Sequence, residues 1–244
     1  MKFLLDLFAA IFKRQPAAPA PAAPQPVFAD AMLVSMVYNV TAPRSAPPGV
    51  ADAFAAAFDR FRLDNRTVQA HILVHCAHES GDFTFVRENL NYSSAARIRE
   101  VFGGNRGIAR LSDAYLHGLV RNPEALANIV YADSNRGEGY KLGNTEPGDG
   151  WKFRGWGWPQ LTGGDVMRRL ADHMGISVDE LLNRTDAATF AYAAVWLAVK
   201  EKPGFTSAAL NDKLPDTRKL WNGGQIGLAD CQRRREQIRQ QTGV

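Results

Sequence analysis

The stretch His78-Glu79-Ser80-Gly81-Asp82-Phe83 follows an apolar helical segment and decides how the chain folds around its first glutamate. A second stretch, Arg87-Glu88-Asn89-Leu90-Asn91-Tyr92, comes directly after it and carries another glutamate. In an unbroken helix, nine residues would separate the two carboxylates by about 13 Å and about half a turn. The two side chains can therefore face one cleft only if the helix ends between them.

Gly81 is the residue predicted to end this helix, because helices often stop at a glycine in the left-handed conformation. Glu79 would then lie in the last helical turn, where the negative end of the macrodipole disfavours a second negative charge. This predicts a raised pKa for Glu79, which suits a proton donor, and leaves Glu88 as the ionised partner. Two such carboxylates in one cleft are what acid/base cleavage of a glycosidic bond requires. The alternative is a pair of solvated surface glutamates.

Four further motifs follow the two glutamate stretches along the chain. They are Asn122-Pro123-Glu124-Ala125-Leu126-Ala127-Asn128-Ile129-Val130-Tyr131-Ala132, Gly148-Asp149-Gly150-Trp151-Lys152-Phe153-Arg154-Gly155, Gln160-Leu161-Thr162-Gly163 and Trp221-Asn222-Gly223-Gly224. Together these segments resemble family 19 of the glycoside hydrolases, which includes chitinases and the lysozyme-like endolysins of bacteriophages. The resemblance covers most of the chain from residue 50 to the C-terminus. It implies a mainly α, lysozyme-like fold whose two lobes flank a groove.

The resemblance also implies roles for individual side chains. Glu79 would protonate the leaving oxygen, Glu88 would activate a water on the opposite face of the sugar, and Thr162 would help to place that water. The residues expected to bind substrate are Asn91, Arg154, Trp156, Gln160, Thr162 and Asn222. His78 has a family counterpart that supports the catalytic glutamate and is not a metal ligand.

Several positions depart from the pattern of the phage relatives. Trp156 stands where those relatives usually have arginine, Trp158 and Pro159 replace an aliphatic pair, Val166 replaces asparagine, and Cys231 replaces the arginine after Gly-Leu-Ala-Asp. We predict that at least one of the two indoles faces the groove, where an aromatic ring can stack on the apolar face of a sugar. The alternative is that both tryptophans pack in the core.

Three histidines, His71, His75 and His78, could share one helix face, and zinc ligands occur at such spacings. The order H-E-x-x-H is absent from the sequence, however, and the pattern requires no remote ligand. We therefore expect no metal and no other cofactor. A metal-dependent hydrolase built on this histidine face is kept as an alternative.

Composition fits a protein with one sizeable core: the chain has 244 residues, 45% hydrophobic and 22% charged. Its net charge of +4 and pI near 9.2 favour weak attraction to anionic surfaces such as bacterial wall polymers. The sequence contains no run of five or six like charges, so it gives no sign of a nucleic-acid partner. Two cysteines do not make a disulfide framework, which places the chain nearer to the bacterial and phage branch than to the cysteine-rich plant chitinases. We expect a monomer.

The N-terminus differs in composition from the rest of the chain. Residues 1–14 form an amphipathic apolar segment that is too short to span a bilayer, which needs about 20 apolar residues. Residues 15–30 are a Pro/Ala-rich linker, and residues 31–244 form the catalytic domain. The segment 1–14 would contact a membrane surface or a partner. The alternative is a helix docked on its own domain.

Helical periodicity dominates beyond Pro48. The predicted helices are 50–61, 67–80 with Asn65 as its cap, 94–102, 108–120, 123–132, 165–174, 178–182, 187–200 and 229–241. Residues 133–161 are rich in glycine and aromatic side chains and lack helical periodicity. A loop of this length is usually functional, so we predict that it lines one wall of the cleft, with or without a short hairpin.

The leading functional hypothesis is an endo-acting, inverting glycosidase that cleaves β-1,4 bonds between N-acetylated amino sugars of peptidoglycan. Such an endolysin-like enzyme would be made in the bacterial host cytoplasm and would act on the cell wall. The alternatives are a chitinase of the same family and a non-catalytic glycan-binding relative. The presence of both glutamates argues against the last of these, since a binding module has no need for an acid/base pair.

Overall fold

The structure is a computed structural model, and it describes residues 27–244. The predicted amphipathic segment 1–14 and most of the predicted linker 15–30 lie outside these residues. The described chain is mainly α-helical, as predicted, and contains no β-strand. Two isolated bridges, Arg87 with Trp156 and Trp156 with Leu161, are the extended pairings within residues 27–244.

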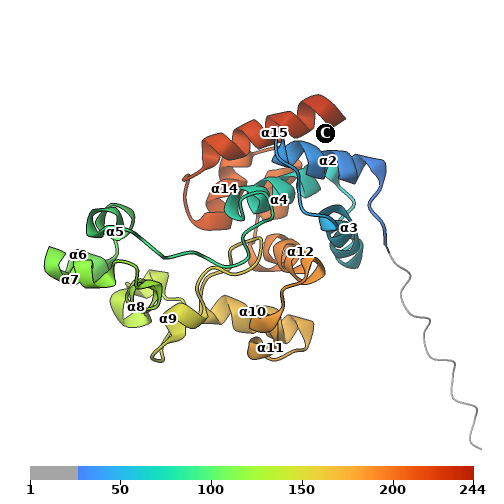
Figure 1. The fold of residues 1–244 in the computed structure, drawn as a ribbon. Coiled ribbons are helices and arrows are strands. Elements are labelled where there is room, and N and C mark those ends of the chain that lie inside the picture. Colours follow the sequence, from blue (N-terminus) through green and yellow to red (C-terminus); the bar gives the residue numbers. More distant parts are fainter. Residues whose placement is uncertain (1–26) are drawn as a thin grey trace, which may run out of the picture.

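The elements follow one another as helices, with longer connections at residues 80–94 and 153–163 (Figure 1). They are α2 (Ala31–Thr41), α3 (Val50–Arg60), α4 (Arg66–Glu79), α5 (Ala95–Phe102), α6 (Arg106–Ala109), α7 (Asp113–Leu119), α8 (Pro123–Val130), η1 (Asp133–Asn135), η2 (Glu138–Tyr140), α9 (Asp149–Lys152), α10 (Gly164–Met174), α11 (Val178–Asn183), α12 (Ala187–Trp196), η3 (Leu197–Glu201), α13 (Phe205–Leu210), α14 (Leu214–Asn222) and α15 (Leu228–Thr242).

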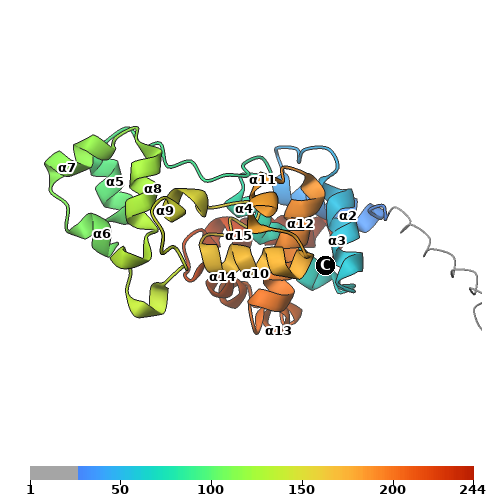
Figure 2. The same cartoon turned by 90° about the horizontal axis from the view of Figure 1, so that it is seen from below.

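Two separate hydrophobic cores divide the molecule into two lobes, as predicted. The larger lobe consists of α2 to α4 and α10 to α15, with α12 packed on α3 and α15 packed on α2. The smaller lobe consists of α5 to α8, and Figure 2 shows it extending from the larger lobe on two connections, one before α5 and one through α9. Its core is made of aliphatic side chains: Leu90, Ala95, Ile98, Ile108, Leu116, Leu119, Leu126, Ala127 and Val130.

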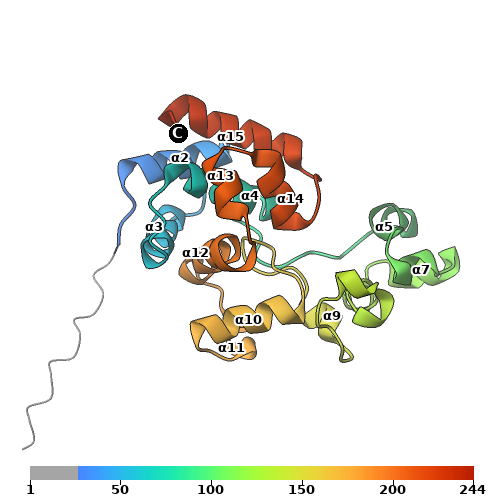
Figure 3. The same cartoon turned by 180° about the vertical axis from the view of Figure 1, so that it is seen from behind.

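Helix α4 runs through the larger lobe with most of its side chains buried (Figure 3). Its start is fixed by Asn65, whose side chain accepts a hydrogen bond from the backbone N–H of Val68, so the predicted cap is confirmed. A helix buried on nearly all sides cannot rotate without breaking its packing. The direction in which its last residue, Glu79, points is therefore set by the core.

Most helix predictions are confirmed, with differences that have local causes. The predicted helix 108–120 is two helices, because Ser112 caps a new helix through a hydrogen bond from the backbone N–H of Tyr115. The predicted helix 187–200 ends as an α-helix at Trp196 and continues as the π-helical turn η3. Helices α2, α9, α13 and α14 were not predicted from the sequence, and α9 and α13 are too short to show a clear period.

Candidate active site

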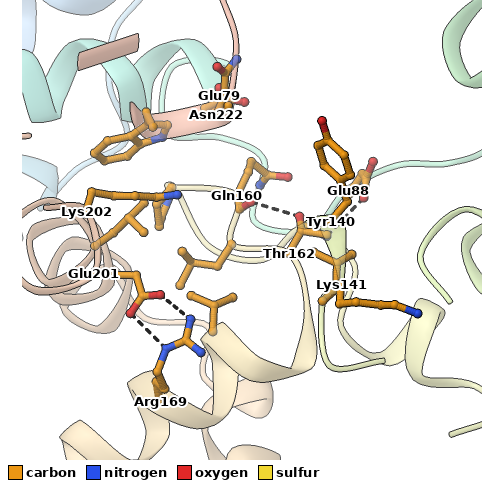
Figure 4. A pocket seen from close by; sticks show the side chains of 18 of the residues that line it. Glu79, Glu88, Tyr140, Lys141, Gln160, Thr162, Arg169, Glu201, Lys202 and Asn222 are labelled. Carbon is orange, nitrogen blue, oxygen red and sulfur yellow. Dashed lines mark hydrogen bonds and ion pairs between the residues drawn. The ribbon is translucent and has the colours of Figure 1, made fainter. Parts of the chain in front are cut away.

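A groove of about 740 Å³ lies where the two lobes meet. It is lined by the end of α4, the segment around Glu88, the stretch 136–142, the turn 155–162, α10, η3 and the end of α14. Glu79 and Glu88 both line it, as do Gln160, Thr162, Trp221 and Asn222. Figure 4 shows Glu79 beside Asn222 on one side and Glu88 farther along the groove, with Gln160 and Thr162 between them.

The end of α4 explains how two glutamates nine residues apart reach one groove. Ser80 is the C-cap of the helix, and Gly81 follows in the left-handed conformation with φ +56°. The helix therefore ends where the sequence analysis predicted. Asp82 also has a positive φ and is held by two arginines, with Arg234 Nη1 2.5 Å from Asp82 Oδ1 and Arg44 Nη1 3.3 Å from Asp82 Oδ2. These ion pairs stabilise the reversal that turns the chain back toward the groove.

Glu79 is paired with an arginine that the sequence analysis did not identify. Arg218 Nη1 donates to Glu79 Oε1 over 2.5 Å, and Arg218 Nε donates to the carbonyl of Ile226 over 2.7 Å. The Arg218 side chain is only 2% exposed. The positive charge of Arg218 opposes the negative end of the α4 macrodipole. The expectation for Glu79 from the sequence rested on that dipole alone. The environment of this carboxyl group is thus set by an ion pair across the fold and not by the helix alone.

Glu88 lies in a different environment, in which both of its carboxyl oxygens accept hydrogen bonds. The Tyr131 hydroxyl donates to Oε1 over 2.6 Å, and the backbone N–H of Gly155 donates to Oε2 over 3.2 Å. Burial raises the pKa of Glu88, while these two hydrogen bonds and the charge of Arg154 oppose the rise. Two donors and no acceptor suit the ionised form, and a raised pKa makes that carboxylate a stronger base.

The wall between the glutamates is a tight turn. Trp156 and Leu161 exchange both of their backbone hydrogen bonds at 2.9 Å, which is the short hairpin-like pairing that the sequence analysis allowed for. Gln160 lies at the tip with φ +52°, and its amide Nε2 donates to the carbonyl of Gly157 over 2.8 Å. Thr162 Oγ1 donates to the carbonyl of Gln160 over 3.2 Å. The turn therefore places both polar side chains in the groove from a rigid backbone.

The prediction that Trp156 or Trp158 faces the groove is wrong. Trp156 is 1% exposed and packs edge-on against Phe190, and Trp158 is 3% exposed with its indole N–H bonded to the carbonyl of Phe83. Neither side chain lines the groove, because the turn directs both indoles into the core of the larger lobe. Trp221 is the tryptophan that lines the groove, and it stacks on His75 with ring centroids 5.2 Å apart.

Two further residues that were expected to bind substrate lie outside the groove lining. Asn91 is exposed, and its backbone N–H donates to the Asn89 side chain. Arg154 stacks on the Trp151 ring, with its guanidinium carbon 3.4 Å from the ring centroid, and donates to the Trp151 carbonyl over 2.7 Å. The charge of Arg154 opposes the rise that burial causes in the pKa of Glu88.

His78 does not contact Glu79. Its Nδ1 lies 2.8 Å from Asp230 Oδ2, and its ring packs so closely on Gly227 that a Cβ there would come within 2.0 Å of His78 Nε2. His78 and Arg218 therefore both hold the connection between α14 and α15, which follows the groove residue Asn222. The Asn222 side chain folds back to accept from the N–H of Gly224. His78 is therefore tied to this connection and not to the glutamate that it was expected to support.

The other two histidines, His71 and His75, are both within hydrogen-bonding distance of one threonine. His71 Nδ1 and His75 Nε2 each lie 3.0 Å from Thr217 Oγ1, inside the larger lobe. Burial lowers the pKa of both rings. Within residues 27–244, no group of three or more His, Cys, Asp or Glu side chains is arranged to hold a metal ion. The three histidines thus separate into a buried pair and one ring that contacts Asp230.

Comparison with known proteins gives the family. No protein-family model matches the chain. A protein of Haemophilus influenzae described as "Glycosyl hydrolase family 19 domain-containing protein" is 31% identical over 202 residues, which cover 81% of this chain and 90% of that protein. Among solved structures, chitinase C from Streptomyces griseus HUT6037 aligns with a TM-score of 0.52 at 16% identity, over 91% of this chain and 96% of its own. A mutant of chitinase C aligns with the same TM-score and identity over 90% and 94%.

The two chitinase C structures are similar to this chain in fold. The Haemophilus protein is similar to it in sequence, at 31% identity over 90% of that protein's length. The chain belongs to glycosyl hydrolase family 19, the glycoside hydrolases of the chitinase and lysozyme type.

Proposed function

We propose that this protein is an endo-acting glycosidase that hydrolyses β-1,4 bonds between N-acetylated amino sugars of peptidoglycan with inversion. The observation that carries the proposal is that Glu79, at the end of α4, and Glu88, in the connection that follows, line one groove. Glu79 is paired with Arg218, and Glu88 accepts hydrogen bonds from Tyr131 and Gly155. Two carboxyl groups across a sugar-sized groove are the apparatus of acid/base glycoside hydrolysis.

In the proposed mechanism, Glu79 protonates the leaving oxygen and Glu88 removes a proton from the attacking water. The water approaches from the face of the sugar opposite to the leaving group, so a single displacement inverts the anomeric centre. Such a mechanism needs about 6.5–9.5 Å between the carboxyl groups, which leaves room for that water. In this proposal Thr162, which lines the groove in the turn between the glutamates, orients that water through its hydroxyl.

An endolysin-like role on the cell wall fits the basic character of the chain, with a net charge of +4. Such a protein would be made in the host cytoplasm and would meet its polymer at the wall. No helix within the described residues is long and apolar enough to cross a membrane. Chitin is the second candidate substrate, because the chitinase C structures share the fold. We propose that the protein acts as a monomer without a cofactor.

The first test is the release of reducing ends from purified peptidoglycan and from chitin oligomers. Glu79→Gln keeps the shape of the side chain but removes the transferable proton, so we expect turnover to fall about 10²–10⁴-fold with folding intact. Glu88→Gln should cause a loss of the same order, because an amide cannot accept the proton.

Glu146→Gln is the matched control, since Glu146 is exposed and lies outside the groove. Near-normal turnover of Glu79→Gln would end the assignment of Glu79 as the acid. No reducing ends from either polymer with the unmodified protein would contradict the proposed activity itself.

A further inference from the structure

The groove carries charges beyond the two catalytic glutamates. Its lining includes four cationic side chains, Arg136, Lys141, Arg169 and Lys202, and one further anion, Glu201. A neutral polysaccharide needs hydroxyl and amide partners and offers nothing for a cation to neutralise. The presence of several cations therefore raises the question of which of them are free to bind substrate.

Three of the four cations are already engaged with the protein. Arg169 forms a two-pronged ion pair with Glu201, drawn at the lower side of the groove in Figure 4. Lys141 Nζ donates to the carbonyl of Asp133 over 2.9 Å, and Arg136 Nε donates to the carbonyl of Tyr140 over 2.5 Å. The contacts of Lys141 and Arg136 tie together residues 133–141, so these charges have a structural use.

Lys202 differs from the other three cations. It follows η3 directly, is half-buried, and within residues 27–244 makes neither a hydrogen bond through its side chain nor an ion pair. Burial lowers the pKa of Lys202, while the nearby charge of Glu201 raises it and that of Arg169 lowers it. Because Glu201 is committed to Arg169, the group of three keeps one uncompensated positive charge. Figure 4 shows the Lys202 ammonium directed into the groove from the wall that carries Glu201.

A partly desolvated ammonium without a partner is unfavourable for the folded protein, and an anionic ligand would offset that cost. The two candidate polymers differ in this respect. Chitin carries hydroxyl and acetamide groups and no charge. Peptidoglycan carries a lactyl ether on every second sugar, whose carboxyl group is either free or joined to a peptide that has carboxylates of its own.

We propose that Lys202 binds a carboxylate on the lactyl or peptide substituent of peptidoglycan and so makes the groove selective for an anionic amino-sugar polymer over neutral chitin. This inference rests on the proposed function and names the residue that sets its substrate class. The carboxylate would occupy the groove beside Lys202, while the scissile bond lies between the two glutamates.

The test compares kcat/KM on three substrates: peptidoglycan with its peptides, glycan strands from which an amidase has removed the peptides, and chitin oligomers. Lys202→Met keeps the length of the side chain and removes its charge. We expect its loss on peptidoglycan to exceed its loss on chitin oligomers about tenfold or more, as is usual for a hydrogen bond to a charged group. Lys202→Arg should retain most of the preference, because it keeps the charge.

Lys200→Met is the matched control, since Lys200 is exposed, lies two residues earlier on η3 and does not line the groove. It should leave all three activities unchanged. A selective loss that appears or grows on amidase-treated strands assigns the lactyl carboxylate, which the amidase frees, and a loss confined to intact peptidoglycan assigns a peptide carboxylate. Raising the salt concentration should reduce the preference of the unmodified protein and have less effect on Lys202→Met.

Equal losses on peptidoglycan and chitin would overturn the proposal, because Lys202 would then serve any sugar chain. Co-sedimentation of the Glu79→Gln variant, with and without Lys202→Met, on insoluble peptidoglycan and chitin tests the same contact without turnover. If the unmodified protein releases no reducing ends, the proposed function fails. Binding of Glu79→Gln to peptidoglycan that is unaffected by Lys202→Met would show that the inference about Lys202 fails as well.

Discussion

Among the residues that line the groove, Glu88 is held in place by hydrogen bonds to both of its carboxyl oxygens. Its carboxyl group is buried enough for its pKa to rise, yet it accepts hydrogen bonds at both oxygens from Tyr131 and Gly155. A base must be ionised to act, so activity should fall as the pH drops through the pKa of Glu88. Because that pKa lies above the ordinary value of 4.5, the acidic limb of the pH profile should also lie above it.

Tyr131→Phe should move this acidic limb to higher pH. The Tyr131 hydroxyl stabilises the charged form of Glu88, so its removal leaves burial less opposed and raises the pKa of Glu88 further. The measurement is the pH dependence of kcat/KM on a soluble oligosaccharide. Tyr115→Phe is the control, because Tyr115 is exposed on α7 and lies outside the groove lining. A limb that stays in place, or moves to lower pH, would show that Glu88 is not the group that limits activity in acid.

At the scale of elements, the turn from Trp156 to Leu161 connects the core to the groove. Its two ends are joined by paired backbone hydrogen bonds, while Trp156 points into the larger lobe and Gln160 points into the groove. The sequence resemblance to phage enzymes implies an arginine in place of Trp156 and an aliphatic pair in place of Trp158 and Pro159. Because both indoles are buried, Trp156 and Trp158 anchor the wall in the core and present no side chain to the groove.

Trp156→Ala should therefore lower stability. Truncating a buried tryptophan costs about 3–5 kcal/mol, the sum of lost transfer free energy and the cavity that remains. Urea denaturation would measure the loss, and Trp156→Phe should lose less because it keeps an aromatic ring against Phe190. Unchanged stability together with weaker polysaccharide binding would contradict the packing role and restore a groove-facing one.

At the scale of the whole molecule, residues 27–244 contain both lobes, both glutamates and the groove between them. The described chain is tied in from its beginning: the backbone N–H of Ala29 donates to Asp52, and Asp30 both caps α2 and pairs with Arg66. We propose that residues 1–14, whose sequence combines an apolar face with Lys2, Lys13 and Arg14, deliver the enzyme to a membrane surface or a partner.

Deleting residues 1–26 should leave hydrolysis of a soluble substrate nearly unchanged and should reduce association with anionic vesicles. Basic residues near a membrane contribute about 1 kcal/mol each, so the difference between the two forms should shrink as salt is raised. Co-sedimentation with vesicles and reducing-end release on the same preparations measure both effects. Loss of activity on soluble substrate after truncation would make residues 1–26 an integral part of the catalytic fold.

The sequence by itself determined the features that depend on neighbours in the chain. Periodicity and capping predicted α4, its start at Asn65 and its end before Gly81, and hence that Glu79 and Glu88 could converge. These are local effects, because a helix end is set by hydrogen bonds and backbone conformations within a few residues. The order of motifs likewise indicated the family and the two-lobed, mainly α fold.

Only the tertiary structure decided which side chains meet across the fold. Arg218 reaches Glu79 from 139 positions away in sequence, and Tyr131 reaches Glu88 from 43 positions away. Trp156 turns inward although its motif resembles a groove wall. Pairings of this kind depend on how helices pack, and no local pattern encodes them. The same holds for the proposed carboxylate-binding role of Lys202, which depends on Glu201 being paired with Arg169. A charged side chain is available to a ligand only when the fold pairs the neighbouring opposite charges with other groups.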